Sequence, residues 1–143
     1  MKKLGYLLLS ILIVGMVALS SYGATSNPNF KQVEIPVDKA VVYIYHSGGS
    51  NHFFILQVKD KNVAGLKKGQ YCAYVTDPGA IEFKATSRGT CSITLDVKAG
   101  QAYYLKGSVP PGFSPTPSLV PVFPEVGVRE IAKYKLISAK NSK

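Results

Sequence analysis

Two histidines, His46 and His52, are the side chains of this sequence best suited to acid–base or metal chemistry near neutral pH. A Gly-Gly pair lies between them, so a hairpin could bring the two imidazoles together as metal ligands. No carboxylate or thiol lies beside them to complete a metal site. Ser47 and Ser50 are close by, but no motif supplies a general base with a substrate position. We therefore expect surface loop histidines, no metal site and no catalytic residue.

Carboxylates are scattered singly along the chain, and the two that could meet are Glu82 and Asp96. Each lies on the polar side of an alternating stretch, so neighbouring strands would place them on one face of a sheet. Paired carboxylates are the signature of glycoside hydrolysis. Because Lys84 and Lys98 each lie two residues away, we expect cross-strand ion pairs on an ordinary sheet surface instead.

Tyrosines are the remaining side chains that could contact a ligand. Tyr103 and Tyr104 are adjacent in a predicted strand, so they must face opposite sides of it. Exposed tyrosines on a sheet could stack on sugar or peptide, whereas buried ones would pack in a core or at an edge with the hydroxyl in water. The tyrosines beyond residue 24 are Tyr43, Tyr45, Tyr71, Tyr74, Tyr103, Tyr104 and Tyr134.

The first 24 residues have the order of a secretory signal peptide. Lys2 and Lys3 are followed by an apolar stretch over residues 7–19 and then by small residues. We expect cleavage near Gly23 or Ala24 and a periplasmic or secreted chain. The alternative is an uncleaved membrane anchor, but the apolar stretch over residues 4–19 is shorter than the roughly 20 residues that span a bilayer. Tyr22 occupies the position where a lipoprotein would need cysteine.

The charge balance is basic, with 17 Lys and Arg against 8 Asp and Glu and a net charge of +9. Without the leader the net charge is +7. The basic residues form no long run, which argues against nucleic acid as a partner. Such a charge favours loose attraction to anionic surfaces, such as lipid head groups or cell-wall polymers.

Two cysteines, Cys72 and Cys91, lie beyond the leader. An even pair in an exported chain predicts a disulfide. It would close a loop of about 20 residues and stabilise the fold by about 3 kcal/mol. The alternative is a pair of buried free thiols. Zinc would need four nitrogen or sulfur ligands at metal spacing, which the sequence lacks.

Short β-branched and aromatic stretches separated by turn residues predict an all-β domain with a sandwich or barrel architecture. Residues 25–38 form an N-terminal arm, and residues 46–51 a flexible turn. We expect an antiparallel β-sandwich of about seven to eight strands over residues 39–138. The predicted strands are residues 39–45, 52–58, 63–66, 70–76, 80–86, 90–98 and 101–109.

Residues 110–124 hold six of the nine prolines, so this segment is neither a central strand nor a helix. We expect a Pro-rich excursion in which residues 119–123 run along a sheet edge. Residues 125–133 show helical spacing, with Glu125 near the start and Lys133 near the end. A last strand over residues 135–138 and a basic tail over residues 139–143 complete the prediction.

Five stretches of the chain share a pattern of turn glycines and core aromatic residues: 39–45 (KAVVYIY), 66–71 (LKKGQY), 78–79 (PG), 95–105 (LDVKAGQAYYL) and 125–127 (EVG). In these stretches the chain resembles the DUF2846 family of small exported bacterial domains, many of them lipoproteins, whose function is undefined. The resemblance implies a sandwich similar to PEGA and transthyretin-type modules, which bind or display rather than catalyse. This chain departs from the family in lacking the lipid-attachment cysteine and in carrying two others. No functional residue can be transferred.

Together these features favour an exported, non-enzymatic cell-envelope protein that binds or displays and needs no cofactor. Its partner would be envelope glycan, a membrane surface or another envelope protein. The alternative is a small secreted enzyme or inhibitor that acts through the His46–His52 loop or through the Pro-rich segment 110–124. A third hypothesis is an assembly subunit whose exposed edge strand pairs with a neighbour.

Overall fold

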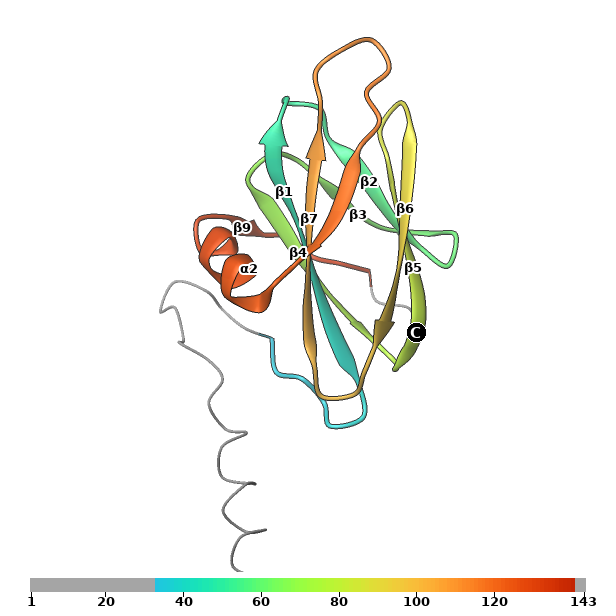
Figure 1. Ribbon diagram of the computed structural model, residues 1–143, viewed down its shortest axis with the longest axis vertical. Coiled ribbons are helices and arrows are strands. Elements are labelled where there is room, and N and C mark those ends of the chain that lie inside the picture. Colours follow the sequence, from blue (N-terminus) through green and yellow to red (C-terminus); the bar gives the residue numbers. More distant parts are fainter. Residues whose placement is uncertain (1–32, 141–143) are drawn as a thin grey trace, which may run out of the picture.

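The computed structural model describes residues 33–140, so the predicted leader and the end of the basic tail lie outside the described residues (Figure 1). Within residues 33–140 the chain is mainly β, as predicted, with nine strands and one short helix. The elements are β1 (Ala40–Gly49), β2 (Phe54–Val58), β3 (Lys61–Leu66), β4 (Gln70–Thr76), β5 (Gly79–Thr86), β6 (Thr90–Val97), β7 (Ala102–Val109), β8 (Ser118–Val122), α2 (Pro124–Ile131) and β9 (Lys135–Leu136).

The strands form two sheets packed face to face, which decides for a sandwich over a barrel. The five-stranded sheet has the order β8-β7-β1-β4-β9, and the four-stranded sheet has the order β3-β2-β5-β6. The predicted sandwich is confirmed and most strand pairs are antiparallel, but the larger sheet is mixed, because β1 runs parallel to β7 and β4 runs parallel to β9. Alternation along one strand does not reveal the direction of its partner.

Strand β1 is longer than the sequence predicts. The expected turn at residues 46–51 is wrong at its start, since β1 continues through Gly49. The reason is pairing with β7, which extends to Gly49 and Val109 after an irregularity that begins at His46. A Gly-Gly pair is typical of a turn when only the local sequence is considered. Here Gly48 and Gly49 instead allow the end of β1 to bend next to β7.

The core between the sheets contains the inward-facing residues of both. Strands β5 and β6 show the expected alternation, with an inward face that is buried in β5 and half-buried in β6. The buried members of this inner core are Ala40, Val42, Ile44, Phe54, Leu56, Val58, Val63, Leu66, Cys72, Tyr74, Ile81, Phe83, Ala85, Val97, Leu105, Val109 and Leu119.

A second apolar layer, the outer core, covers the other face of the five-stranded sheet. Helix α2 and residues 33–35 pack on it, so β1 is buried on both faces, as its apolar composition predicts. Gly127 allows the helix to approach closely, because a Cβ there would lie 2.4 Å from the ring of Tyr104. The buried members of the outer core are Val41, Tyr43, Tyr45, Tyr71, Tyr104 and Ile131.

The C-terminal segment joins the two sheets at one edge (Figure 1, red). After α2, β9 pairs with β4, and the Ile137 amide donates to the Tyr71 carbonyl at 2.9 Å. Further on, the Lys140 amide donates to the Val63 carbonyl of β3 at 3.0 Å. Residues 135–140 therefore close the side of the sandwich between β4 and β3.

No helix within the described range 33–140 has both the length and the apolar character needed to cross a bilayer.

Candidate functional site

His46 is buried in the structure, so the expectation of a surface loop residue is wrong for this histidine. Its Nδ1 accepts a hydrogen bond from the Gly48 amide at 3.2 Å, and its Nε2 lies 2.8 Å from the His52 carbonyl oxygen. A ring that accepts at Nδ1 carries its proton on Nε2 when neutral. Stacking on Phe54, with ring centroids 5.2 Å apart, completes its surroundings.

These contacts give His46 a structural role, because its ring links the end of β1 to the loop that follows. Burial lowers the pKa of His46 from the ordinary value of 6.5, and the nearby charge of Lys68 lowers it further. The hydrogen bond to the His52 carbonyl opposes both effects. The nearby hydroxyls are also engaged with backbone, since Ser47 donates to the Gly107 carbonyl and Ser50 to the Val109 carbonyl. The two imidazoles are not arranged as a metal pair, and residues 33–140 contain no cluster of three potential ligands.

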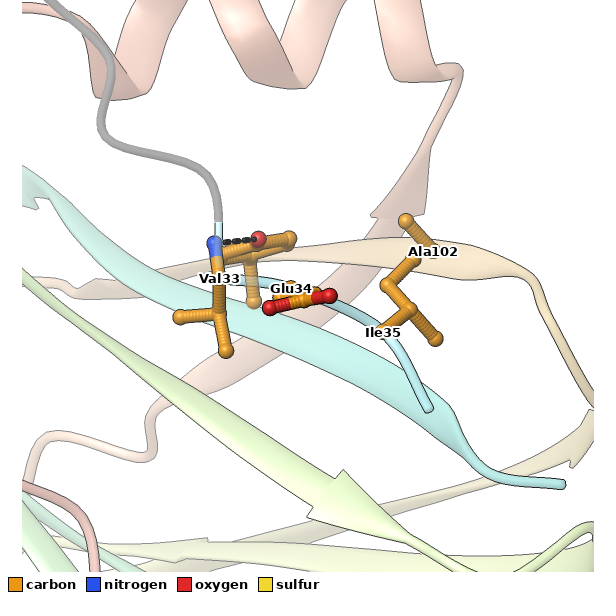
Figure 2. Close-up of a pocket in the computed structure, with 5 residues that line it drawn as sticks. Val33, Glu34, Ile35 and Ala102 are labelled. Atoms are coloured by element: carbon orange, nitrogen blue, oxygen red, sulfur yellow. Dashed lines mark hydrogen bonds between the residues drawn. The ribbon is translucent and has the colours of Figure 1, made fainter. Parts of the chain in front are cut away.

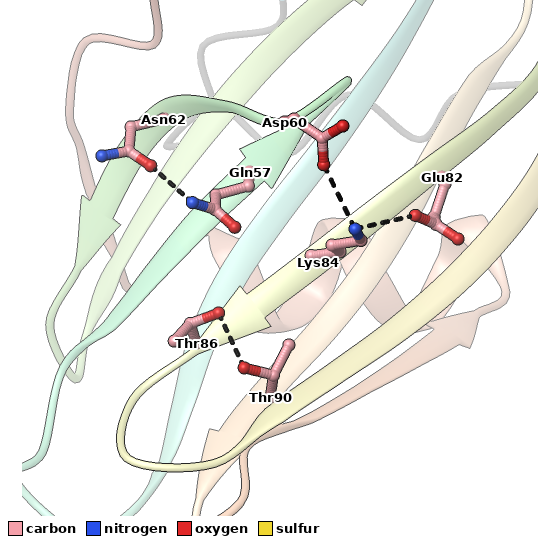
Figure 3. Close-up of polar contacts among 7 residues, drawn as sticks. All are labelled: Gln57, Asp60, Asn62, Glu82, Lys84, Thr86 and Thr90. Carbon is pink, nitrogen blue, oxygen red and sulfur yellow. Dashed lines mark hydrogen bonds and ion pairs between the residues drawn. The ribbon is translucent and has the colours of Figure 1, made fainter.

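Glu82 and Asp96 lie on the exposed face of the four-stranded sheet, but they do not form a facing pair. Asp96 is opposite Ala80, and Glu82 is opposite Thr94. Lys84 lies between two carboxylates, 3.4 Å from Glu82 and 3.2 Å from Asp60 (Figure 3). The polar face carries ion pairs, but the expected cross-strand pairing of Glu82 is wrong, because its partner Lys84 lies on the same strand.

Cys72 and Cys91 are free thiols, so the expected disulfide is absent. The side chain of Cys91 hydrogen-bonds to the backbone of Leu119 in β8, whereas Cys72 lies in β4, three strands further across the sheet. At about 4.8 Å per strand, β8 and β4 are about 14 Å apart. That exceeds the roughly 7 Å between Cα atoms that a disulfide tolerates. Burial raises the pKa of the Cys72 thiol to about 12.

The tyrosines build cores and present no stacking platform. Tyr43 and Tyr104 stack with centroids 5.1 Å apart under α2, whereas Tyr103 points to the opposite side and packs against the inner core. Its hydroxyl accepts a hydrogen bond from the Lys98 amide at 2.9 Å. Tyr45 donates to the Glu130 carboxylate at 2.7 Å.

Glu130 is a polar contact of the outer core that the sequence did not reveal. It accepts hydrogen bonds from Tyr45 and from Lys106, the latter at 3.1 Å. Burial opposes its ionisation, but these two hydrogen bonds outweigh burial and lower the pKa of Glu130. The arrangement ties α2 to strands β1 and β7 of the sheet.

A hollow of about 450 Å³ lies between the N-terminal segment and the outer face of the five-stranded sheet (Figure 2). Val33, Ile35 and Ala102 supply apolar walls, and Glu34 supplies a carboxylate. The Tyr43 hydroxyl is already engaged, since it accepts a hydrogen bond from the Val33 amide at 3.0 Å. One charged group on an otherwise apolar lining specifies no ligand.

Four loops meet at one end of the sandwich, because β1, β3, β5 and β7 all finish there (Figure 1, upper end). We call this surface the loop end. It consists of residues 50–53, 67–69, 87–89 and 110–117.

Hydrogen bonds hold these loops to their neighbours. The Gly69 amide donates to the His46 carbonyl at 3.0 Å, and Ser50 donates to the end of β7. Arg88 donates from Nη1 to the Phe113 carbonyl, while the Gly89 amide donates to the Pro115 carbonyl at 3.0 Å. Loops 87–89 and 110–117 are therefore tied to each other, whereas loops 50–53 and 67–69 are tied to residues of β7 and β1.

The charge of the loop end has a single sign. Its charged residues are Lys67, Lys68 and Arg88, all exposed, and its four loops contain no Asp or Glu. Neither lysine forms an ion pair with any residue in the range 33–140. Unpaired like charges on one surface create a positive potential that attracts anions.

The opposite end of the sandwich, residues 36–39, 59–60, 77–78 and 98–101, has mixed charge. Lysines there lie among Asp38, Asp60 and Asp77. Lys39 pairs with Asp77 at 2.7 Å. The positive field thus belongs to the loop end and is not a general property of the surface.

Sequence reasoning named the His46–His52 loop and the Pro-rich segment 110–124 as separate candidates, but it did not join them to Lys67, Lys68 and Arg88, because these residues are far apart along the chain. In the sequence Lys67 and Lys68 form one small basic pair, and Phe113 lies within the Pro-rich excursion. Only the shared direction of the odd-numbered strands from β1 to β7 brings them to one end.

The fold thus defines a two-sheet β-sandwich with a helix on its larger sheet. Comparison of the chain with protein-family models, curated proteins and solved structures found no match, and the resemblance to DUF2846 stays a prediction.

Proposed function

We propose that this chain is an exported, non-enzymatic binding module of the cell envelope, and that it attaches to an anionic partner through the loop end. The observation that carries the proposal is the separation of charge between the two ends. Lys67, Lys68 and Arg88 are exposed at the loop end without a carboxylate in its loops, whereas the opposite end is mixed. The signal-peptide pattern of residues 1–24 supports export.

The engagement of the potential catalytic groups supports binding over catalysis. The ring of His46 is committed to backbone at both nitrogens, and the Ser47 and Ser50 hydroxyls donate to carbonyls. A general base must reach a proton of the substrate. A buried imidazole with both nitrogens occupied lacks that reach.

The test is retention in the envelope fraction of the exporting cell as salt is raised. High salt shortens the Debye length and weakens attraction between exposed charges, so the wild-type chain should be released. The double variant Lys67→Glu/Lys68→Glu should bind at least tenfold more weakly, since each basic residue near an anionic surface contributes about 1 kcal/mol.

The matched control is Lys61→Glu/Lys98→Glu, which changes the net charge equally; Lys98 lies in the opposite end, and Lys61 begins β3 next to it. Both lysines are exposed. This control should bind like the wild type. Equal loss in both double variants would show that only net charge matters and would contradict a loop-end site.

The alternative function, a protease inhibitor acting through residues 110–124, has one supporting observation. Phe113 lies on a protruding loop that Arg88 and Gly89 hold in place, and a constrained convex loop loses little freedom on binding an enzyme groove. Stoichiometric inhibition of a serine protease that prefers aromatic residues, abolished by Phe113→Ala, would favour this alternative over envelope attachment.

A further inference from the structure

The loop between β7 and β8 presents an aromatic side chain to solvent. Phe113 is 92% exposed, although it is a large apolar residue. Pro110, Pro111 and Ser114 around it are exposed, whereas Pro115 at the base of the loop is buried. The loop extends beyond its neighbours at the upper end of the molecule (Figure 1, orange). An exposed phenylalanine at the tip of a long loop has no role in the core of this domain.

The loop is held in this position by its neighbour. Besides the bonds from Arg88 and Gly89, the two loops are in close contact, since a Cβ at Gly89 would lie 2.3 Å from Thr116 Oγ1. Arg88 also brings its positive charge to the Phe113 carbonyl. The tip therefore combines a cation and an aromatic ring in one constrained unit, so little conformational freedom remains to be lost on binding.

We propose that the anionic partner is a phospholipid bilayer, with Phe113 entering the interface while Lys67, Lys68 and Arg88 contact the phosphate head groups; this inference rests on the proposed function. A soluble polyanion would satisfy the lysines but would leave Phe113 in water. An anionic bilayer accommodates both the cations and the ring. Burial of one phenylalanine side chain should strengthen binding by about tenfold to a hundredfold.

The composition of the chain supplies a direct test, because it contains no tryptophan. Phe113→Trp places a single fluorescent reporter at the loop tip, and Val37→Trp places one at the opposite end, where Val37 is also 92% exposed. Each full chain, purified from the exporting cell, is mixed with vesicles of phosphatidylglycerol and phosphatidylcholine or of phosphatidylcholine alone. Emission is also recorded with lipids brominated on their acyl chains.

We expect the emission of Trp at position 113 to shift to the blue with anionic vesicles and to be quenched by brominated lipid. The reporter at position 37 should stay in water. Phe113→Ala should weaken binding to anionic vesicles about tenfold without changing the urea midpoint of unfolding. Phe123→Ala, at a residue 77% exposed beside α2, is the aromatic control and should bind like the wild type.

The outcomes separate this inference from the proposed function. A reporter at position 113 that stays in water, with envelope retention still dependent on Lys67 and Lys68, overturns the bilayer and leaves an anionic polymer as the partner. If retention is independent of those lysines and the reporter does not respond, both proposals are wrong. A response of the reporter at position 37 alone would place the membrane contact at the opposite end and overturn the inference.

Discussion

At the scale of single residues, His46 connects the interior of the sandwich to the loop end. Its buried ring contacts the Gly48 amide near the end of β1 and the His52 carbonyl in the loop between β1 and β2. Protonation would remove the Nδ1 acceptor and place a charge beside Lys68. The neutral imidazole is therefore part of what keeps this loop in place.

We predict that the free energy of unfolding decreases as the pH falls from about 7 to about 5. The pKa of His46 in the folded state is below 6.5, so the unfolded chain binds a proton more readily than the folded chain. Lowering the pH therefore stabilises the unfolded state relative to the folded state. Urea denaturation at several pH values measures this dependence. His46→Gln should reduce it, and His52→Gln, at an exposed position, should leave it unchanged.

The cysteines give a second prediction at this scale. Intact mass without reductant should equal the reduced mass, and alkylation in denaturant should add two labels, one for each cysteine of the chain. In the folded protein Cys72 should resist alkylation, because burial raises the pKa of its thiol to about 12 and the thiolate is the nucleophile. A mass two hydrogens lighter would show a disulfide and contradict the arrangement of β4 and β6.

At the scale of elements, the contact between α2 and the sheet depends on Gly127. Gly127→Ala should lower the free energy of unfolding by about 1–3 kcal/mol, because the new methyl group overlaps the ring of buried Tyr104. The helix propensity gained from alanine, about 1 kcal/mol, offsets only part of that cost.

Chemical denaturation measures the Gly127 effect, and Gly65→Ala in β3 is the matched control. A Cβ at Gly65 has no neighbour within 4 Å, so this variant should be neutral or slightly stabilised. Equal destabilisation of both variants would mean that the effect is not a clash under α2.

Element positions could largely be predicted from the sequence, whereas their partners could not. The alternation of Cys91, Ile93 and Leu95 depends only on neighbours in the chain, and β6 was located to within one residue. The end of β1 was missed because its pairing with β7 lies some 60 residues away. The loop end shares this limit, since it depends on strand direction and register, which local patterns do not contain.

At the scale of the whole molecule, the C-terminal segment completes the structure rather than trailing from it. A chain that ends at Tyr134 keeps α2 but loses β9 and the backbone hydrogen bonds to Gly69, Tyr71 and Val63. We predict a loss of about 2–4 kcal/mol in the free energy of unfolding, since each hydrogen bond contributes about 1 kcal/mol and Ile137 also packs against the inner core.

The truncated chain can be compared with the full chain by urea denaturation. Binding of a dye that fluoresces on apolar surfaces should rise, because the edge between β4 and β3 is opened. The control is a chain that ends at Lys140, because it keeps all three of these hydrogen bonds. Unchanged stability in the chain that ends at Tyr134 would contradict a closing role for residues 135–140.

The parallel pairing of β1 with β7 also determines when this chain can fold. β1 is the central strand of its sheet, yet one of its two neighbours begins only at Ala102. A nascent chain that has reached residue 90 therefore cannot complete its larger sheet, and pairing of this kind is slow to form. A polypeptide that passes through a translocation channel must remain unfolded during transit. For the exported chain that we propose, this topology would keep the polypeptide in that state until nearly all of it has been synthesised.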